Sequence, residues 1–300
     1  MIFKFLKSFL YSCLCMVLFY SNGLFAEESR IVIMSSLNNE IGQQVLNGFQ
    51  IAQSKMSRQV KLIQDTGVNI SPPPNLVVIL GNQALESAHM RFPDTQQLAC
   101  LILDKNHIQN SNHETGIVLE HNIKDQLSWY RKFLPQSKRI GVLYSPEHNA
   151  KWVKQAELEA KRQGLKLVSI AVNSAHELPA SLKAIKRNAD AILAIKDPVV
   201  YSGKTAKAVL LFTFRNRIPF IGLSKAWVKA GALYALDWDY ISLGEQCAGI
   251  ADSMLSGKTA NKIPLQKPEK INLIINMKTA TYMKMSIKQS LIDDAAQVFE

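Results

Sequence analysis

The stretch "KRIGVLYSPEHNAKWVKQAELEAKRQGLKLVSIAV", Lys138–Val172, contains a complete strand–helix–strand unit. An apolar run over Arg139–Leu143 predicts a buried strand, and a second run over Lys166–Ile170 predicts its neighbour. Between them, Asn149–Gln163 has apolar residues at helical spacing and is followed by a glycine, which predicts a helix. A helix that joins two such strands is typical of a parallel sheet.

The same alternation of short apolar runs and longer amphipathic segments extends in both directions. Further strands are predicted at Arg30–Met34, Val60–Gln64, Leu76–Leu80, Leu98–Leu103, Ala191–Ile195, Pro219–Gly222 and Ile271–Ile275. Further helices are predicted at Ile41–Lys55, Gln83–Arg91, Lys124–Phe133, Ala175–Arg187, Gly203–Asn216 and Ser242–Leu255. This order predicts an α/β fold with doubly wound, largely parallel sheets.

The alternation occurs twice, which predicts two Rossmann-like lobes. A first series ends near His121, a second begins at Arg139, and a helix between them joins the two. We expect lobe one over 27–122, completed by about 240–260, and lobe two over 123–239, completed by about 261–300. Loops at the carboxyl ends of the strands should face a crevice between the lobes, because such sheets bind ligands there.

The N-terminus has the pattern of a secretory signal peptide over residues 1–26. Lys4 and Lys7 are followed by an apolar run, and Ala26 precedes the polar Glu27. This pattern predicts cleavage and a periplasmic location. Two alternatives are an uncleaved N-terminal anchor and a lipoprotein signal that ends at Cys13.

The chain is basic, with a formal net charge of +11. Two features argue against a nucleic-acid partner. The protein is expected to be exported, and its lysines are scattered along the chain without interleaved aromatic residues. The charge favours anionic ligands or the surface of an anionic membrane. Outside the signal segment, Cys100 and Cys247 lie in apolar surroundings, where either a disulfide or two buried thiols would fit.

Several stretches resemble one family, the periplasmic substrate-binding proteins of ABC transporters. They are "PQSKRIGVLYSPEHN" (135–149), "NADAILAIKDPVVYS" (188–202), "IPFIGLSKAWVKAGALYALDWDYISLGEQ" (218–246), "INLIINMKTA" (271–280) and, more loosely, "NLVVILGNQALESA" (75–88) and "ETGIVLEH" (114–121). The resemblance covers about residues 30–290. It implies a two-lobed type I periplasmic binding protein fold that closes on a small molecule and is read by an ABC permease. Some members of the family bind aromatic amino acids.

One stretch departs from the family pattern. Members carry a helix between their second and third strands, where this chain has "QDTGVNISPPPN", Gln64–Asn75. Three consecutive prolines exclude a helix interior, so lobe one is expected to be trimmed. The resemblance therefore does not identify the ligand of this chain. An alternative function is a ligand-sensing or accessory module for a membrane sensor or receptor, with a weak or empty cleft. We expect a monomer in either case.

Candidate ligand-binding residues follow the predicted strands at the crevice. In lobe one they are Ser36, Asn38, Gly81, Asn82 and Asp104, and in lobe two Tyr144, Ser145, Lys196, Asp197, Tyr201, Ser224 and Trp227. Hydroxyl and amide side chains at these places also serve as helix caps, and tryptophan is more often a packing residue. Asp237 and Asp239 fall near the expected hinge, where a structural role is equally consistent.

Catalytic patterns are absent from the sequence. It contains no GxSxG, HExxH or CxxC motif, and its histidines lack the spacing of metal ligands on one helix face. We therefore expect a binding protein without enzymatic activity, metal or cofactor.

Overall fold

A computed structural model describes residues 28–56, 60–68, 70–108 and 112–300. The expected signal peptide lies outside these residues. Within the described ranges, no helix combines the length and the apolar character that crossing a membrane requires.

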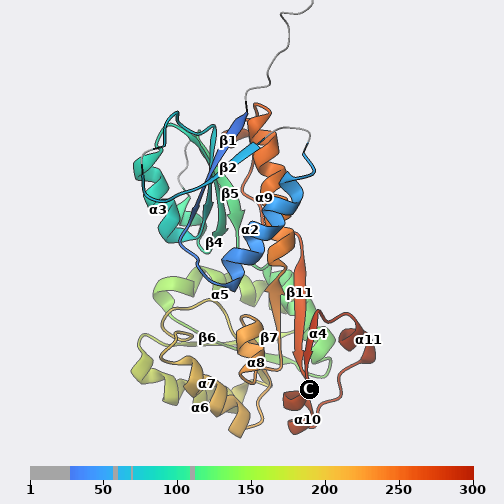
Figure 1. Cartoon of the computed structure of the whole chain (residues 1–300). Coiled ribbons are helices and arrows are strands. Elements are labelled where there is room, and N and C mark those ends of the chain that lie inside the picture. The colour runs from blue at the N-terminus through green and yellow to red at the C-terminus, as the bar shows by residue number, and fades with distance from the viewer. Residues whose placement is uncertain (1–27, 57–59, 69, 109–111) are drawn as a thin grey trace, which may run out of the picture.

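Lobe one is built on a five-stranded parallel sheet with the order β2-β1-β3-β4-β5. Its strands are β1 (Ser29–Ser35), β2 (Val60–Gln64), β3 (Leu76–Leu80), β4 (Gln96–Ile102) and β5 (Glu114–Val118). Helices α2 (Glu40–Gln53) and α9 (Tyr240–Leu255) pack against one face of the sheet, and α3 (Asn82–Arg91) packs against the other. The short turn η1 (Lys105–His107) follows β4. Figure 1 shows this lobe above the second.

Lobe two has a seven-stranded sheet with the order β12-β11-β10-β9-β8-β6-β7. Its strands are β6 (Arg139–Tyr144), β7 (Lys166–Ala171), β8 (Ala191–Leu193), β9 (Phe220–Gly222), β10 (Tyr234–Trp238), β11 (Ile271–Asn276) and β12 (Gln297–Phe299). Its helices are α4 (Ile123–Phe133), α5 (Pro146–Arg162), α6 (Leu178–Asn188), α7 (Ala206–Arg215), α8 (Lys225–Lys229), α10 (Met277–Tyr282) and α11 (Gln289–Asp293), with the short turn η2 (Ala175–Glu177). The short turn η3 (Ala260–Lys262) follows α9 and packs on lobe one. The strands are parallel except where β11 runs antiparallel to β10.

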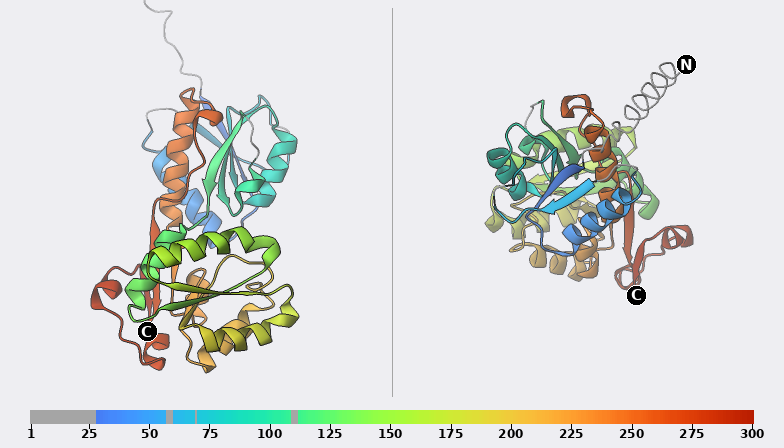
Figure 2. Two further views of the ribbon diagram at one scale, coloured as in Figure 1. Left: turned by 180° about the vertical axis from the view of Figure 1, so that it is seen from behind. Right: turned by 45° about the horizontal axis from the view of Figure 1, so that its top comes forward.

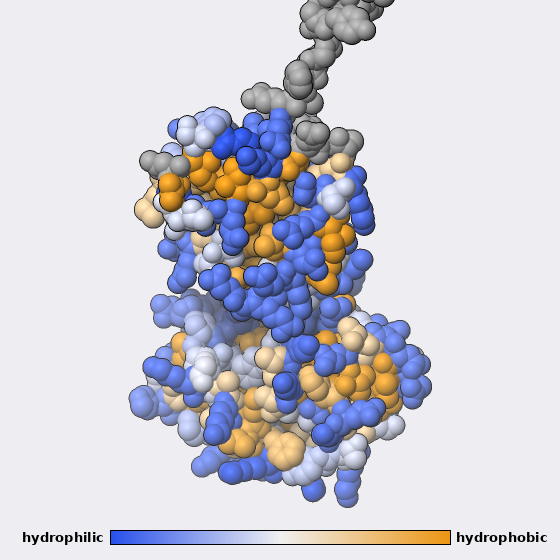
Figure 3. All heavy atoms as spheres, viewed as in Figure 1, coloured by the Kyte–Doolittle hydropathy of each residue, from blue (hydrophilic) through white to orange (hydrophobic). Residues whose placement is uncertain are grey.

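Each sheet is buried on both faces, which explains why several strands are continuous apolar runs. All five residues of β3 are buried, as are all five of β10. On the face that Figure 3 shows, hydrophilic residues border hydrophobic areas in each lobe, and the molecule narrows between the two lobes. Within the described residues the chain passes between the lobes three times, after β5, after β10 and before β11.

Helix α9 belongs to lobe one although it follows a strand of lobe two. Gly48 of α2 and Gly244 of α9 allow the two helices to approach closely: a Cβ added to Gly244 would lie 2.1 Å from the carbonyl oxygen of Val45. A disulfide between Cys100 of β4 and Cys247 also fixes α9 to the sheet. The sequence left the state of these cysteines open, and the structure resolves it as a bridge.

The α/β fold class predicted from the sequence is confirmed. Three strands were missed, β5, β10 and β12. No helix occurs in the described residues between β2 and β3, as the prolines of that stretch predicted. Helix α5 begins at Pro146, three residues before its predicted start, because proline fits the first turn of a helix.

Candidate functional site

The carboxyl ends of the lobe-one strands bring three predicted residues, Ser36, Gly81 and Asn82, together at the edge that faces lobe two. The backbone N–H of Ser36 donates to the carbonyl of Leu80 at 3.2 Å. Gly81 has φ +94°, and a Cβ there would lie 2.7 Å from Ser36 Oγ. Asn82 Oδ1 accepts a 3.3 Å hydrogen bond from the N–H of Leu103. Glycine at 81 is thus required both by the backbone conformation and by the close approach of the neighbouring loop.

Two other predicted lobe-one residues are exposed at the same edge. Asn38 lies in the loop before α2, and its neighbour Asn39 caps that helix by accepting from the N–H of Gly42 at 3.1 Å. The Asp104 carboxylate accepts from the N–H of Asn106 at 2.9 Å and so caps the turn η1.

Lys196 links the two lobes at this edge. It follows β8 in lobe two, and its Nζ donates a 2.6 Å hydrogen bond to the carbonyl oxygen of Leu103 in lobe one. Desolvation lowers the pKa of the Lys196 amine, and the opposite charge of Asp104 offsets part of that shift. The basic side chain therefore sits between the lobes, next to an acidic one.

Asp197 and Ser145 form a buried network inside lobe two. The Asp197 carboxylate accepts from the backbone N–H and the hydroxyl of Ser145 at 2.6 and 2.8 Å, and from Asn149 Nδ2 at 2.8 Å. It also accepts from the N–H groups of Val199 and Val200, each at 2.9 Å. Burial raises the pKa of Asp197, but these donors outweigh burial and the net pKa lies below the usual range. These bonds fasten the loop after β8 to the start of α5.

The remaining predicted residues of lobe two differ in burial. Tyr144 and Ser224 are half-buried at the ends of β6 and β9. Tyr201 is buried, and its ring meets that of Trp227 edge-on with 5.9 Å between centroids. Trp227 also packs on Phe220, at 5.7 Å. Tyr201 and Trp227 thus belong to an aromatic cluster within the core of lobe two, beneath the interlobe edge.

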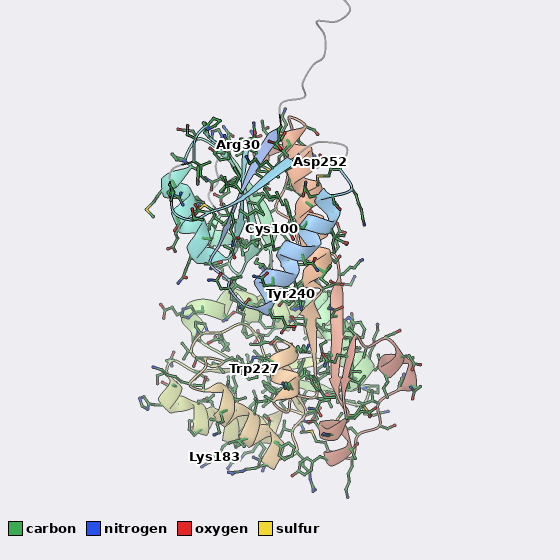
Figure 4. The ribbon with its side chains drawn as sticks, viewed as in Figure 1. Arg30, Cys100, Lys183, Trp227, Tyr240 and Asp252 are labelled. Carbon is green, nitrogen blue, oxygen red and sulfur yellow. A yellow bond between two sulfur atoms is a disulfide. The ribbon has the colours of Figure 1, made fainter. Side chains whose placement is uncertain are left out.

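The hinge contains a second network, centred on Asp237. One carboxylate oxygen accepts from the N–H of Lys225 at 2.8 Å, and the other accepts from the hydroxyl of Tyr240 at 3.0 Å. Burial, together with the Asp237 charge, raises the pKa of Tyr240. Asp239 caps α9 by accepting from the N–H of Ser242 at 2.9 Å. Figure 4 places Tyr240 between the lobes, so both aspartates serve the crossing from β10 to α9.

His121 was not among the predicted ligand-binding residues, yet it lies in the first crossing and stacks on Trp238 in the second. Their ring centroids are 3.8 Å apart and the planes differ by 14°. Burial lowers the pKa of His121 to about 4, although a hydrogen bond to the Leu236 carbonyl opposes the shift. Among the residues that the structure describes, His121 Nδ1, Gln126 Oε1 and the Tyr234 hydroxyl have no hydrogen-bond partner. These three residues line a small cavity of about 20 Å³.

The third crossing is tied to the first. The N–H of Val118 donates to the carbonyl of Gln266 at 2.9 Å, and Lys267 Nζ lies 3.2 Å from Glu120 Oε2. All three crossings are therefore linked by short-range contacts. Within the part of the chain that the structure describes, no group of three or more His, Cys, Asp or Glu side chains is arranged to hold a metal ion.

Comparison with known proteins identifies relatives of the chain. Residues 80–299 match the model of a family described as ABC transporter substrate binding protein. A tyrosine-binding protein of Clostridioides difficile (strain R20291) is 26% identical over 166 residues, which are 55% of this chain and 48% of that protein. An uncharacterized protein of Rickettsia prowazekii (strain Madrid E) is 25% identical over 174 residues, 58% of this chain and 55% of that protein. The chain thus spans about half the length of these curated relatives.

Solved structures agree on the fold. The ligand-free, open form of a substrate binding protein with adhesive properties from Clostridium difficile has a TM-score of 0.76 at 18% identity, over 90% of this chain and 99% of that one. An ABC domain from Streptococcus pneumonia in complex with L-Trp has a TM-score of 0.64 at 19% identity, over 91% of this chain and all of that one. The two lobes have the type I periplasmic binding protein fold.

Proposed function

Because the chain belongs to the ABC transporter substrate binding protein family, we propose that it is the solute-binding component of an ABC-type uptake system. It takes an amino acid or a small organic anion between its lobes, and it acts in the periplasm after export by its signal peptide. The observation that carries this proposal is the hydrogen bond from Lys196 to Leu103, which supports closure of the two lobes at the edge where their strands end.

The residues proposed to meet the ligand are those that lie at that edge, where Gly81 contributes its backbone. They are Ser36, Asn38, Gly81, Asn82 and Asp104 from lobe one and Tyr144, Lys196 and Ser224 from lobe two. Asp104 and Lys196 offer one charge of each sign, which suits the amino and carboxylate groups of a free amino acid. Ser145 and Asp197 are proposed to support the site without contacting the ligand, because their polar atoms are hydrogen-bonded to each other within lobe two. Tyr201 and Trp227 are proposed to do the same through the packing of their rings.

Binding is proposed to shift an equilibrium between open and closed arrangements of the lobes. A ligand that contacts both lobes favours the closed arrangement by the difference in its affinity for the two. The permease is then proposed to recognise the closed form. The crossings provide the hinge, because the chain passes through them and they contact one another.

A thermal-shift screen of residues 28–300 tests the proposal. Tyrosine and tryptophan come first, since a curated relative is named for tyrosine and a structural neighbour holds L-Trp, followed by other amino acids and organic anions. A ligand at a hundred times its dissociation constant adds about 2.7 kcal/mol of stability and raises the melting temperature by several degrees. Tyr144→Ala should reduce the shift, and Lys151→Ala on α5 serves as the control.

A second candidate is an accessory module for a membrane sensor or receptor. The observation in its favour is the direct passage from β2 to β3 without a helix in the described residues, since this removes surface from lobe one. A folded chain that gives no thermal shift with any compound of the screen would support this candidate and count against the first.

A further inference from the structure

The end of lobe two farthest from lobe one is basic and carries exposed aromatic rings. Helices α6, α7 and α10 form this end in Figure 1 and in the left view of Figure 2. None of the three helices contains an aspartate or a glutamate. We define the basic aromatic face by Lys183, Arg187, Phe214, Arg215, Arg217 and Tyr282, all of which are exposed. Lys183 lies at the tip of the lobe in Figure 4.

The two aromatic rings of this face are stacked and remain open to solvent. Phe214 of α7 and Tyr282 of α10 have centroids 4.2 Å apart and planes that differ by 7°. Phe214 is 39% exposed and Tyr282 is 38% exposed. The guanidinium of Arg217 lies over the Tyr282 ring at 5.3 Å from its centroid. One turn before Phe214, Leu211 is also exposed and adds an aliphatic group to the patch.

The three helices form one continuous surface. Lys186 Nζ of α6 donates to Asn216 Oδ1, just after α7, at 2.6 Å. The ring stack joins the other side of α7 to α10. The nearest acidic residue in sequence after α6 is Asp190, which is paired with Arg139 at 2.7 Å. The positive charge of the face is therefore not neutralised by acidic residues of its own helices.

We propose that the basic aromatic face binds the surface of a bilayer that contains anionic phospholipids. Lysine and arginine near such a surface are attracted by the negative headgroups, and aromatic rings partition into the interface between headgroups and acyl chains. The face combines both features in one patch, and charge complementarity selects an anionic surface as its occupant. The contact would hold the protein at the membrane by lobe two and leave the interlobe edge exposed. This inference does not depend on the proposed function.

Vesicle sedimentation of residues 28–300 tests the proposal. Vesicles of phosphatidylcholine with one third phosphatidylglycerol should bind the protein, pure phosphatidylcholine vesicles should not, and binding should weaken as salt rises. A triple variant, Lys183→Gln, Arg187→Gln and Arg215→Gln, should lose on the order of a hundredfold in partition coefficient at low salt. Circular dichroism and thermal melting verify that each variant is folded.

A matched triple variant distinguishes binding by the basic aromatic face from attraction by the net charge of the whole protein. Lys151→Gln, Lys154→Gln and Lys161→Gln remove the same charge from exposed positions of α5, which lies on the side of lobe two toward lobe one (Figure 2). This variant should bind like the parent chain. Equal losses in the two triple variants would show attraction by net charge alone and would overturn the proposal.

Two further measurements test the role of the aromatic rings and the membrane as the binding partner. Phe214→Ser together with Tyr282→Ser should weaken binding, whereas Tyr282→Phe should preserve it. Unchanged binding by the double serine variant would overturn the role of the rings. The membrane would be excluded as the occupant of the face if the parent chain did not bind anionic vesicles at low salt. The same conclusion would follow if it bound an acidic protein but not the vesicles.

Discussion

The side-chain amine of Lys196 in lobe two lies 2.6 Å from the carbonyl oxygen of Leu103 in lobe one, and this hydrogen bond spans the edge between the lobes. Lys196→Met removes the donor while it keeps most of the side-chain length. The contact is solvent-accessible, so we expect the closed arrangement to lose up to about 1 kcal/mol relative to the open one. Small-angle scattering should show a larger radius of gyration for the variant.

Lys151→Met is the matched control for this substitution. Lys151 is an exposed lysine of α5 within the same lobe, so its loss changes the net charge equally. A radius of gyration that rises equally in both variants, or in neither, would contradict a closing role for Lys196.

His121 should make stability depend on pH between about 4 and 6.5. Burial holds the folded-state pKa at about 4, whereas an unfolded chain has the ordinary value near 6.5. The unfolded state therefore takes up more protons, and the free energy of unfolding falls as pH drops through this window, by about 3 kcal/mol in total. Denaturant titrations at several pH values measure the slope.

The variant His121→Phe retains a ring against Trp238 and removes the titrating group. Its pH dependence in the same window should be flatter than that of the parent chain by the same amount. If the free energy of unfolding changed with pH equally in the parent chain and in the variant, groups other than His121 would cause the pH dependence. His176→Phe provides a control, because His176 is exposed in the turn η2 of lobe two.

The disulfide between Cys100 and Cys247 should contribute strongly to stability. The two cysteines are 147 residues apart, and closing so long a loop restricts the unfolded chain, which predicts a stabilisation of about 2–5 kcal/mol. Replacing both cysteines with alanine should lower the melting temperature, and a reducing agent should lower it only in the parent chain. A reducing agent that leaves the parent's melting temperature unchanged would contradict this prediction.

The fold could be predicted from the sequence because its strands are buried on both faces. Such strands are apolar runs, as in Leu76–Leu80, and they stand out from amphipathic helices. The strand Glu114–Val118 was missed because it begins with a charged residue and contains glycine. The strand Gln297–Phe299 has three residues, too few to show a period.

The candidate site was less predictable, since the sequence gives a residue's place on the chain and not the direction of its side chain. Asp197 and Lys196 are neighbours after the same strand, yet Asp197 accepts hydrogen bonds inside lobe two while Lys196 reaches lobe one. His121 and Trp238 stack across two crossings that are far apart in sequence, so no local pattern could have paired them.

Gly244 should be the glycine of α9 that tolerates substitution least. A Cβ at this position would lie 2.1 Å from the Val45 carbonyl oxygen and 2.7 Å from the Phe49 nitrogen, both of which are backbone atoms of α2. Gly244→Ala must therefore move the helices apart, and we expect it to cost about 1–3 kcal/mol. Gly249 in the same helix meets no atom within 4 Å, so Gly249→Ala should instead stabilise the chain by about 0.5–1 kcal/mol through helix propensity. Denaturant unfolding of the two variants measures both effects, and a loss of similar size in each would mean that the close approach of α2 and α9 is not what requires glycine at position 244.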